Sequence, residues 1–139
     1  MSKLSALSLS DTPYKMPVIN PKTGVVMKTN EENPREAFIM VKSISSVEAN
    51  DFKRRTYEEA RKSRKRKELG MPYDEVIDRT AEMLAELTTG WFLVDFNGEV
   101  IDEPFSFEAA KRIYSEPPLD WLRRQVDEAV NDDANFTPS

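Results

Sequence analysis

The sequence predicts an α+β fold: a small N-terminal antiparallel β-sheet, a long basic helix, and a mostly helical C-terminal half with one hairpin or turn. Turn residues break residues 17–44 into short strand-like runs. The pair Asn97-Gly98, flanked by apolar residues, is typical of a tight hairpin. Apolar residues recur at helical spacing in several other segments, which are residues 47–60, 73–87, 107–115 and 119–130.

The first strands are expected after a flexible arm. Residues 1–16 are rich in Ser and weakly apolar, and we expect them to order only on contact with another surface. Residues 17–28 predict two short strand segments around a turn, because Asn20-Pro21 starts turns and Gly24 can adopt a positive φ.

Residues 36–44 predict the strongest strand of the N-terminal half. Alternation places Phe38 and Met40, with Lys42, on one face, and Ile39 and Val41 on the other. A sheet of two or three short strands is marginal alone, so we expect a helix or a partner to cover it.

The basic helix is predicted over residues 45–69. Ser45 followed by Glu48 fits a capping box, and Gly70 and Pro72 end the helix. Past Ala60 the sequence has no apolar face, which is typical of a helix that enters solvent or meets a partner. Between residues 53 and 67 there are nine basic residues and two acidic ones.

The cleanest amphipathic helix is predicted over residues 73–87. Residues 91–96 then predict a strand or extended segment, and residues 99–101 its return after the Asn97-Gly98 turn. Ser106 is expected to cap a helix over residues 107–115, whose predicted inner face is Ala109, Ala110, Ile113 and Tyr114. Pro117-Pro118 opens the last helix, whose predicted apolar stripe is Leu119, Leu122, Val126 and either Ala129 or Val130.

These elements predict a single α+β domain at residues 17–136, between the arm and a short tail at residues 137–139. Within it, residues 17–44 form the β part, residues 45–69 the basic helix and residues 73–136 the helical part. Charge is separated along the chain, because there are eleven acidic and four basic residues from Asp95 onward while the middle is basic. Opposite charges permit head-to-tail self-association, which we hold as a hypothesis.

The composition argues against an enzyme. The chain has no His and no Cys, which removes the commonest general base, thiol nucleophiles and Cys-based zinc sites. With four glycines there is no phosphate-binding loop, so we expect no catalytic residue, no cofactor and no metal. The acidic group Asp95, Glu99, Asp102 and Glu103 does not match a calcium loop and is interpreted as a solvated turn.

We also expect no membrane segment and no signal peptide. No apolar run reaches about 18 residues, the length that a spanning helix needs. The N-terminus alternates Leu or Ala with Ser instead of forming a continuous apolar region. A cytoplasmic protein is therefore the default expectation.

The candidate partner-binding residues are aromatic or basic. Trp121 lies off the apolar stripe of the last helix, and either burial or partial exposure fits its position. Phe136 either packs back on the helices or serves as a tail anchor, whereas Trp91 is expected in the core. The basic candidates are Arg61, Lys62, Arg64, Lys65, Arg66 and Lys67.

The basic run fits three environments. It can be a solvated or protein-facing helix end, where cations suit the helix dipole. It can contact an acidic protein, or it can bind nucleic acid through phosphates. No aromatic residue lies between Arg61 and Leu69, and the overall charge is −5, so nucleic acid is the least favoured of the three.

The order of several motifs resembles the C-terminal half of the tail assembly chaperones of long-tailed bacteriophages. The motifs are Gly90-Trp91, Asn97-Gly98, Pro104-Phe105-Ser106, Ala109-Ala110, Ile113-Tyr114, Trp121-Leu122, Gln125-Val126 and Asn135-Phe136. The first half is similar in outline, with a Pro-x-Thr-Gly turn, an apolar strand and a charged helix. The chain departs from the family at Phe92-Leu93-Val94, where an Asp usually follows the Trp.

The resemblance implies a non-enzymatic protein that binds the tape-measure protein and recruits tail tube subunits during tail assembly in the host cytoplasm. The alternative is a structural protein of the phage neck or tail that remains in the particle. A third possibility is a DNA-binding regulator that uses the basic helix, and the acidic overall balance counts against it.

Overall fold

The computed structural model describes residues 7–62 and 73–138, with side chains in residues 7–59 and 79–138. It confirms the predicted α+β class. Strands β1 (Tyr14–Pro17), β2 (Phe38–Val41) and β3 (Thr88–Phe92) form an antiparallel sheet in the order β1-β2-β3. The described helices are α1 (Val47–Lys62), α3 (Tyr73–Leu87), α4 (Phe107–Ser115) and α5 (Asp120–Asn131), with 3-10 turns η2 (Pro117–Leu119) and η3 (Asp133–Phe136).

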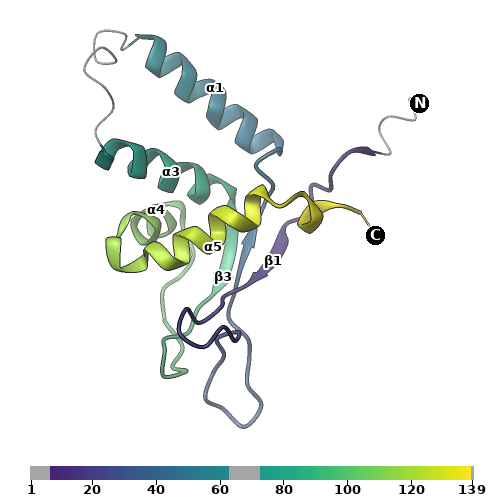
Figure 1. Ribbon diagram of the computed structural model, residues 1–139, viewed down its shortest axis with the longest axis vertical. Coiled ribbons are helices and arrows are strands. Elements are labelled where there is room, and N and C mark those ends of the chain that lie inside the picture. Colours follow the sequence, from purple (N-terminus) through teal and green to yellow (C-terminus); the bar gives the residue numbers. More distant parts are fainter. Residues whose placement is uncertain (1–6, 63–72, 139) are drawn as a thin grey trace.

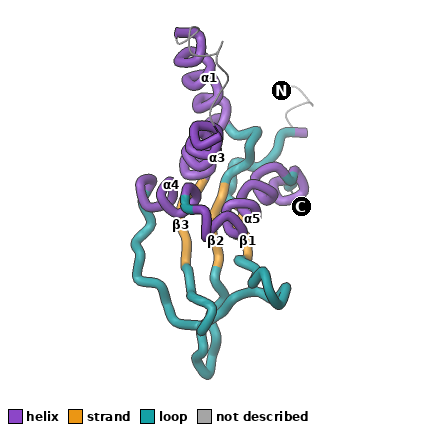
Figure 2. Tube along the Cα trace, turned by 60° about the vertical axis from the view of Figure 1, so that its left-hand side comes forward, coloured by secondary structure: helices purple, strands orange, loops and turns teal. Residues whose placement is uncertain are grey.

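The helices α3, α4 and α5 lie together on one face of the sheet (Figures 1 and 2), while α1 projects beyond it and contacts α3. The strand register explains the two faces. Ile39 is level with Met16 on one side and with Trp91 on the other, and these side chains point towards the helices. Phe38, level with Pro17 and Phe92, points to the opposite face. The alternation predicted for this strand is therefore confirmed.

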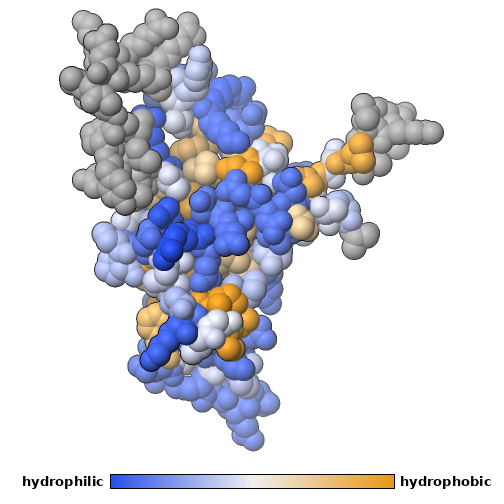
Figure 3. Space-filling model, in the orientation of Figure 1, coloured by the Kyte–Doolittle hydropathy of each residue, from blue (hydrophilic) through white to orange (hydrophobic). Residues whose placement is uncertain are grey.

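The hydrophobic core lies between the sheet and the helices. The largest fully buried side chains are Tyr114, Phe136, Ile39, Leu84, Leu87, Val41, Val126 and Val130. Of the apolar stripe predicted for the last helix, Leu122, Val126 and both Ala129 and Val130 are buried in α5, whereas Leu119 lies in η2 and is only partly buried. Burial of each large aliphatic side chain contributes about 1.5–3 kcal/mol, so this stripe holds α5 on the sheet. Figure 3 shows a hydrophilic surface over α5 and an apolar patch directly below it.

Residues 7–16 differ from the expected flexible arm. Tyr14–Pro17 forms β1, because the edge of β2 supplies hydrogen-bonding partners that the arm itself lacks. The backbone N–H of Ser10 also donates to the carbonyl of Phe136 at 2.7 Å. Residues 1–6 of the predicted arm lie outside the described residues.

The start of α1 also differs from the prediction. The hydroxyl of Ser46, not that of Ser45, accepts a hydrogen bond from the N–H of Ala49 at 3.3 Å. Glu48 does not close a capping box with Ser45, because its carboxylate accepts from the Lys42 ammonium at 2.6 Å. This hydrogen bond lowers the pKa of the Glu48 carboxyl below its usual range. Residues 63–69 of the predicted helix lie outside the described residues.

The strand or extended segment predicted at residues 91–96 is a regular strand only at Trp91 and Phe92. β3 begins at Thr88, directly after α3, and beyond Phe92 the predicted hairpin keeps only a bridge between Val94 and Val100. The Asp95 carboxylate accepts from the N–H groups of Asn97 and Glu99, which replaces ladder hydrogen bonds within the turn. The chain does turn here, but not in the predicted two-residue form. The N–H of Gly98 donates to the carbonyl of Asp95 at 3.1 Å, and of the turn residues only Gly98 has a positive φ, of 83°.

Candidate functional site

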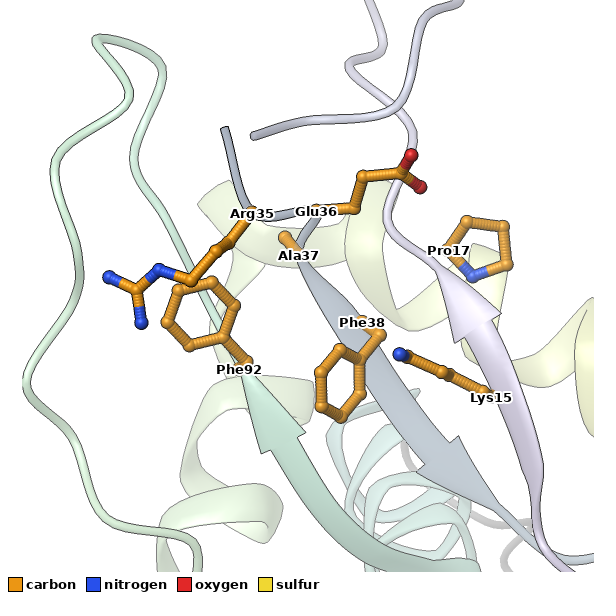
Figure 4. A pocket seen from close by; sticks show the side chains of 7 residues that line it. All are labelled: Lys15, Pro17, Arg35, Glu36, Ala37, Phe38 and Phe92. Carbon is orange, nitrogen blue, oxygen red and sulfur yellow. The ribbon is translucent and has the colours of Figure 1, made fainter. Parts of the chain in front are cut away.

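The first candidate surface is the face of the sheet that the helices leave uncovered. Figure 4 shows Phe38 and Phe92 side by side on β2 and β3, with Lys15 reaching over from β1 and Arg35 from the loop before β2. The two phenyl rings are half-buried, with centroids 6.3 Å apart. Together with Pro17, Glu36 and Ala37 they line an open hollow of about 830 Å³.

Each ring of this hollow is covered by a cation. The Lys15 ammonium lies 4.4 Å from the centroid of the Phe38 ring, and the Arg35 guanidinium carbon 4.8 Å from that of Phe92. Such contacts stabilise by about 0.5–1 kcal/mol at exposed sites. Arg35 also donates to the Glu31 carboxylate at 3.0 Å, and this hydrogen bond lowers the pKa of Glu31. The long side chains therefore shield aromatic surface from water.

The second candidate surface is a groove between the β3–α4 connection and the two C-terminal helices, here called the Trp121 groove. It has a volume of about 350 Å³. Its apolar lining is Val18, Leu93, Val94, Ile101, Ile113, Leu119, Trp121 and Leu122, and its polar lining is Asp102, Glu103, Arg112 and Glu116. This volume and this largely apolar lining are typical of sites that bury a few side chains of a partner or a small ligand.

Two local structures shape the Trp121 groove. Ser106 caps α4, because its hydroxyl accepts from the N–H of Ala109 at 3.0 Å, as the sequence predicted. The indole of Trp91 donates to the carbonyl of Glu103 at 2.8 Å, and its ring packs edge-on against Phe105. These contacts hold the β3–α4 connection against the sheet and so fix one wall of the groove.

Trp121 is half-buried, in agreement with the partial exposure that its position allows. Its ring lies 5.7 Å from that of Phe96, which is 63% exposed at the tip of the β3–α4 connection. The sequence did not predict this contact. Phe96 is the one aromatic residue in a turn of mostly polar residues, and no local pattern indicates that it contacts Trp121, 25 positions later. The apolar run Phe92-Leu93-Val94 was a signal that this connection is more hydrophobic than a solvated turn.

The other candidate residues are not brought to this groove. Phe136 is 2% exposed and packs edge-on against Tyr14 at 6.2 Å, so the structure realises the alternative in which it packs back on the fold. Its ring is therefore not accessible to a partner. The side chains of Arg61 and Lys62, and all of Arg64, Lys65, Arg66 and Lys67, lie outside the described residues.

The uncovered sheet face was not among the candidate sites. One feature of the sequence did indicate it: residues 38–41 are apolar on both faces of the predicted strand. If helices cover Ile39 and Val41, Phe38 and Met40 must lie on the other face of the sheet. The side chains in residues 7–59 and 79–138 form no cluster of three or more His, Cys, Asp or Glu that could hold a metal ion.

Comparisons with known proteins assign no family. No family model matches the chain, and neither a curated protein nor a solved structure is significantly similar to it. None of the helices in the described part of the chain has both the length and the hydropathy that a bilayer crossing requires.

Proposed function

We propose that this protein is a non-enzymatic tail assembly chaperone of a long-tailed bacteriophage. It binds the tape-measure protein in the host cytoplasm and recruits tail tube subunits to it. Its mechanism is binding without bond chemistry, in which accessible apolar surface holds aggregation-prone segments of the client until the tail forms.

The observation that supports this proposal most is where the accessible apolar surface lies. The motifs that resemble the chaperones include Asn97-Gly98, Pro104-Phe105-Ser106 and Trp121-Leu122. Trp121 and Leu122 of the third motif line the Trp121 groove. The first two motifs lie in the β3–α4 connection, on either side of Ile101, Asp102 and Glu103, which also line it. Surface that a binding protein needs therefore overlaps in part with the sequence on which the resemblance rests.

The direct test is co-expression. The tagged chain is produced with the candidate tape-measure and tail tube proteins from the same genome, and the soluble fraction is purified on the tag. We expect a tape-measure segment that is insoluble alone to become soluble and to co-purify. If that segment stays insoluble in the presence of excess chain, the chaperone proposal is wrong.

A second measurement separates the chaperone from a structural virion protein. A chaperone leaves before the tail is complete, so mass spectrometry of purified particles should detect tube and tape-measure peptides but no peptide of this chain. Stoichiometric recovery of the chain in finished particles would favour the structural alternative.

A further inference from the structure

Exposed apolar side chains concentrate beside Trp121. The described residues include seven large apolar side chains of high exposure, and three of them belong to the β3–α4 connection. These are Phe96 at 63%, Val100 at 47% and Ile101 at 43%. Phe96 packs on the Trp121 ring, and Ile101 lines the groove with it. Soluble proteins seldom leave such apolar surface contiguous unless something binds there.

The polar lining of the Trp121 groove is negative. Glu103 is neutralised by an ion pair with Arg112 across the groove lining. Asp102 and Glu116 have no cationic partner anywhere in residues 7–59 and 79–138. Two uncompensated carboxylates therefore lie beside an apolar surface. A partner that covers this surface binds more favourably if it places positive charges next to them.

We propose that the Trp121 groove binds an amphipathic helix of a protein partner, with Lys or Arg residues flanking its apolar stripe. Two or three apolar side chains of the helix enter the groove, and the cations meet Asp102 and Glu116. A central, half-buried Trp is the residue type that most often dominates such interfaces.

The same charges argue against two other occupants. Nucleic acid would bring phosphates against the free carboxylates. A second copy that paired its groove symmetrically with this one would place the two acidic linings together. This inference rests on the proposed function only for the identity of the client, which would be a helix of the tape-measure protein.

The test measures peptide binding to the full chain by fluorescence anisotropy. The probes are labelled peptides of about 18 residues, long enough for five helical turns. One is an idealised Leu/Lys amphipathic helix, one is its Leu/Glu counterpart, and the others are the predicted amphipathic helices of the candidate tape-measure protein. We expect the cationic peptides to bind and the Leu/Glu peptide to bind at least about tenfold more weakly, with the difference shrinking at high salt.

Groove variants locate the site. Trp121→Ala should weaken binding by about 30-fold or more, as expected for a central aromatic anchor. Ile101→Asp tests the same surface through an exposed side chain whose replacement spares the core. The control is Val47→Asp, which makes the same kind of exchange at a more exposed apolar residue, at the start of α1. Circular dichroism verifies that each variant folds.

Charge variants test the carboxylates. Asp102→Asn combined with Glu116→Gln should weaken the cationic peptides by about two- to tenfold at low salt and reduce the salt dependence. Glu58→Gln combined with Glu59→Gln removes the same charge from exposed positions of α1 and should leave binding unchanged.

The outcomes separate this inference from the proposed function. The inference is wrong if the groove variants bind the peptides as tightly as wild type does, or if the Leu/Glu peptide binds more tightly than the Leu/Lys peptide. It is also wrong if sedimentation shows a dimer that the groove variants dissociate, since the occupant would then be a second copy. If wild type and the groove variants retain tape-measure protein equally, the proposal that the groove is the binding site is wrong, but the chaperone proposal stands. If the Leu/Lys peptide binds through the groove but no tape-measure protein is retained, the groove is supported as a binding site and the chaperone proposal is wrong.

Discussion

The side-chain amide of Gln125 pairs with the backbone of Ile19 through two hydrogen bonds. The N–H of Ile19 donates to Oε1 at 2.9 Å, and Nε2 donates to the Ile19 carbonyl at 2.7 Å. The amide thus imitates a strand at a place where the chain leaves β1, and it ties α5 to a loop 106 residues earlier. The sheet and the C-terminal helices are joined by this pair as well as by apolar contact.

Removal of the Gln125 amide should destabilise the fold. We expect Gln125→Ala to lower the free energy of unfolding by about 1–3 kcal/mol, because two partly buried backbone groups lose their partners. Gln125→Glu is the sharper variant, since an ionised carboxylate still accepts from Ile19 but cannot donate to its carbonyl.

At pH 7 the Gln125→Glu variant should therefore be less stable than wild type, and the gap should narrow as the pH falls and the introduced carboxyl gains a proton. Urea unfolding of both proteins at several pH values measures it. Equal stability at pH 7 would mean that the hydrogen bond to the carbonyl contributes nothing.

A buried hydroxyl pair links β3 to α4. Thr88 Oγ1 donates to the Leu84 carbonyl at 2.7 Å and lies 2.8 Å from the Tyr114 hydroxyl. Because the only proton of the Thr88 hydroxyl goes to Leu84, Tyr114 is the donor in the second hydrogen bond. The two positions are therefore not equivalent as targets for mutation.

Thr88→Val should cost more than Tyr114→Phe. The valine leaves the Tyr114 hydroxyl buried without an acceptor, at about 1–3 kcal/mol, whereas the phenylalanine removes a donor whose partner keeps its other hydrogen bond, at about 1 kcal/mol. The double variant should lose less than the sum of the single losses. Chemical denaturation of the four proteins gives the coupling; strict additivity would show that the two hydroxyls do not interact.

Tyr114 also predicts loss of stability at alkaline pH. Burial raises the pKa of the Tyr114 phenol well above its usual value. A raised pKa in the folded state stabilises the fold fully below the pKa of the unfolded chain, about 10, and the contribution is lost as the pH rises beyond it. Unfolding measured from pH 8 to 11 should show a steeper decline for wild type than for Tyr114→Phe; parallel curves would contradict the assignment.

The sequence predicted elements whose signals are local and missed those that depend on distant partners. The stripe of α5, the Ser106 cap and the alternation of Phe38 with Ile39 follow from spacing within one element. The four residues of β1 carry no such pattern and become a strand only because β2, more than 20 positions later, offers an edge. The Trp121 groove was predicted in part, since Trp121 was a candidate, but Phe96 reaches it through a turn whose direction the Asp95 carboxylate sets.

The two glycines of positive φ should respond differently to substitution. Gly24 has φ of 73° with no atom within 4 Å of an added Cβ, so Gly24→Ala should cost only the left-handed backbone, about 1–2 kcal/mol. At Gly98, with φ of 83°, the same Cβ would also lie 2.8 Å from the backbone nitrogen of Asn30. Asn30 donates to the carbonyl of Gly98, so the clash breaks the contact between the two loops. Gly98→Ala should therefore lower the melting temperature clearly more than Gly24→Ala. Equal decreases in melting temperature would mean that Gly98 does not lie against Asn30.

Adjacent serines give the last test, because sequence and structure assign the N-cap of α1 to different residues. Ser45 fits the capping-box spacing with Glu48, but in the structure the hydroxyl of Ser46 accepts from Ala49 and Glu48 pairs with Lys42. Loss of a true cap costs about 1 kcal/mol, whereas an exposed serine costs within about 0.5 kcal/mol.

Ser46→Ala should therefore destabilise α1 while Ser45→Ala leaves it unchanged, as read from helicity and from the free energy of unfolding. Glu48→Gln supplies an independent arm. If Glu48 acts through Lys42, its lowered pKa means that its contribution is present above about pH 4.5 and is lost as the pH falls through the folded-state value, so wild type and Glu48→Gln should converge in acid. The opposite ranking of the serines, with no convergence, would restore the capping box and start α1 one residue earlier.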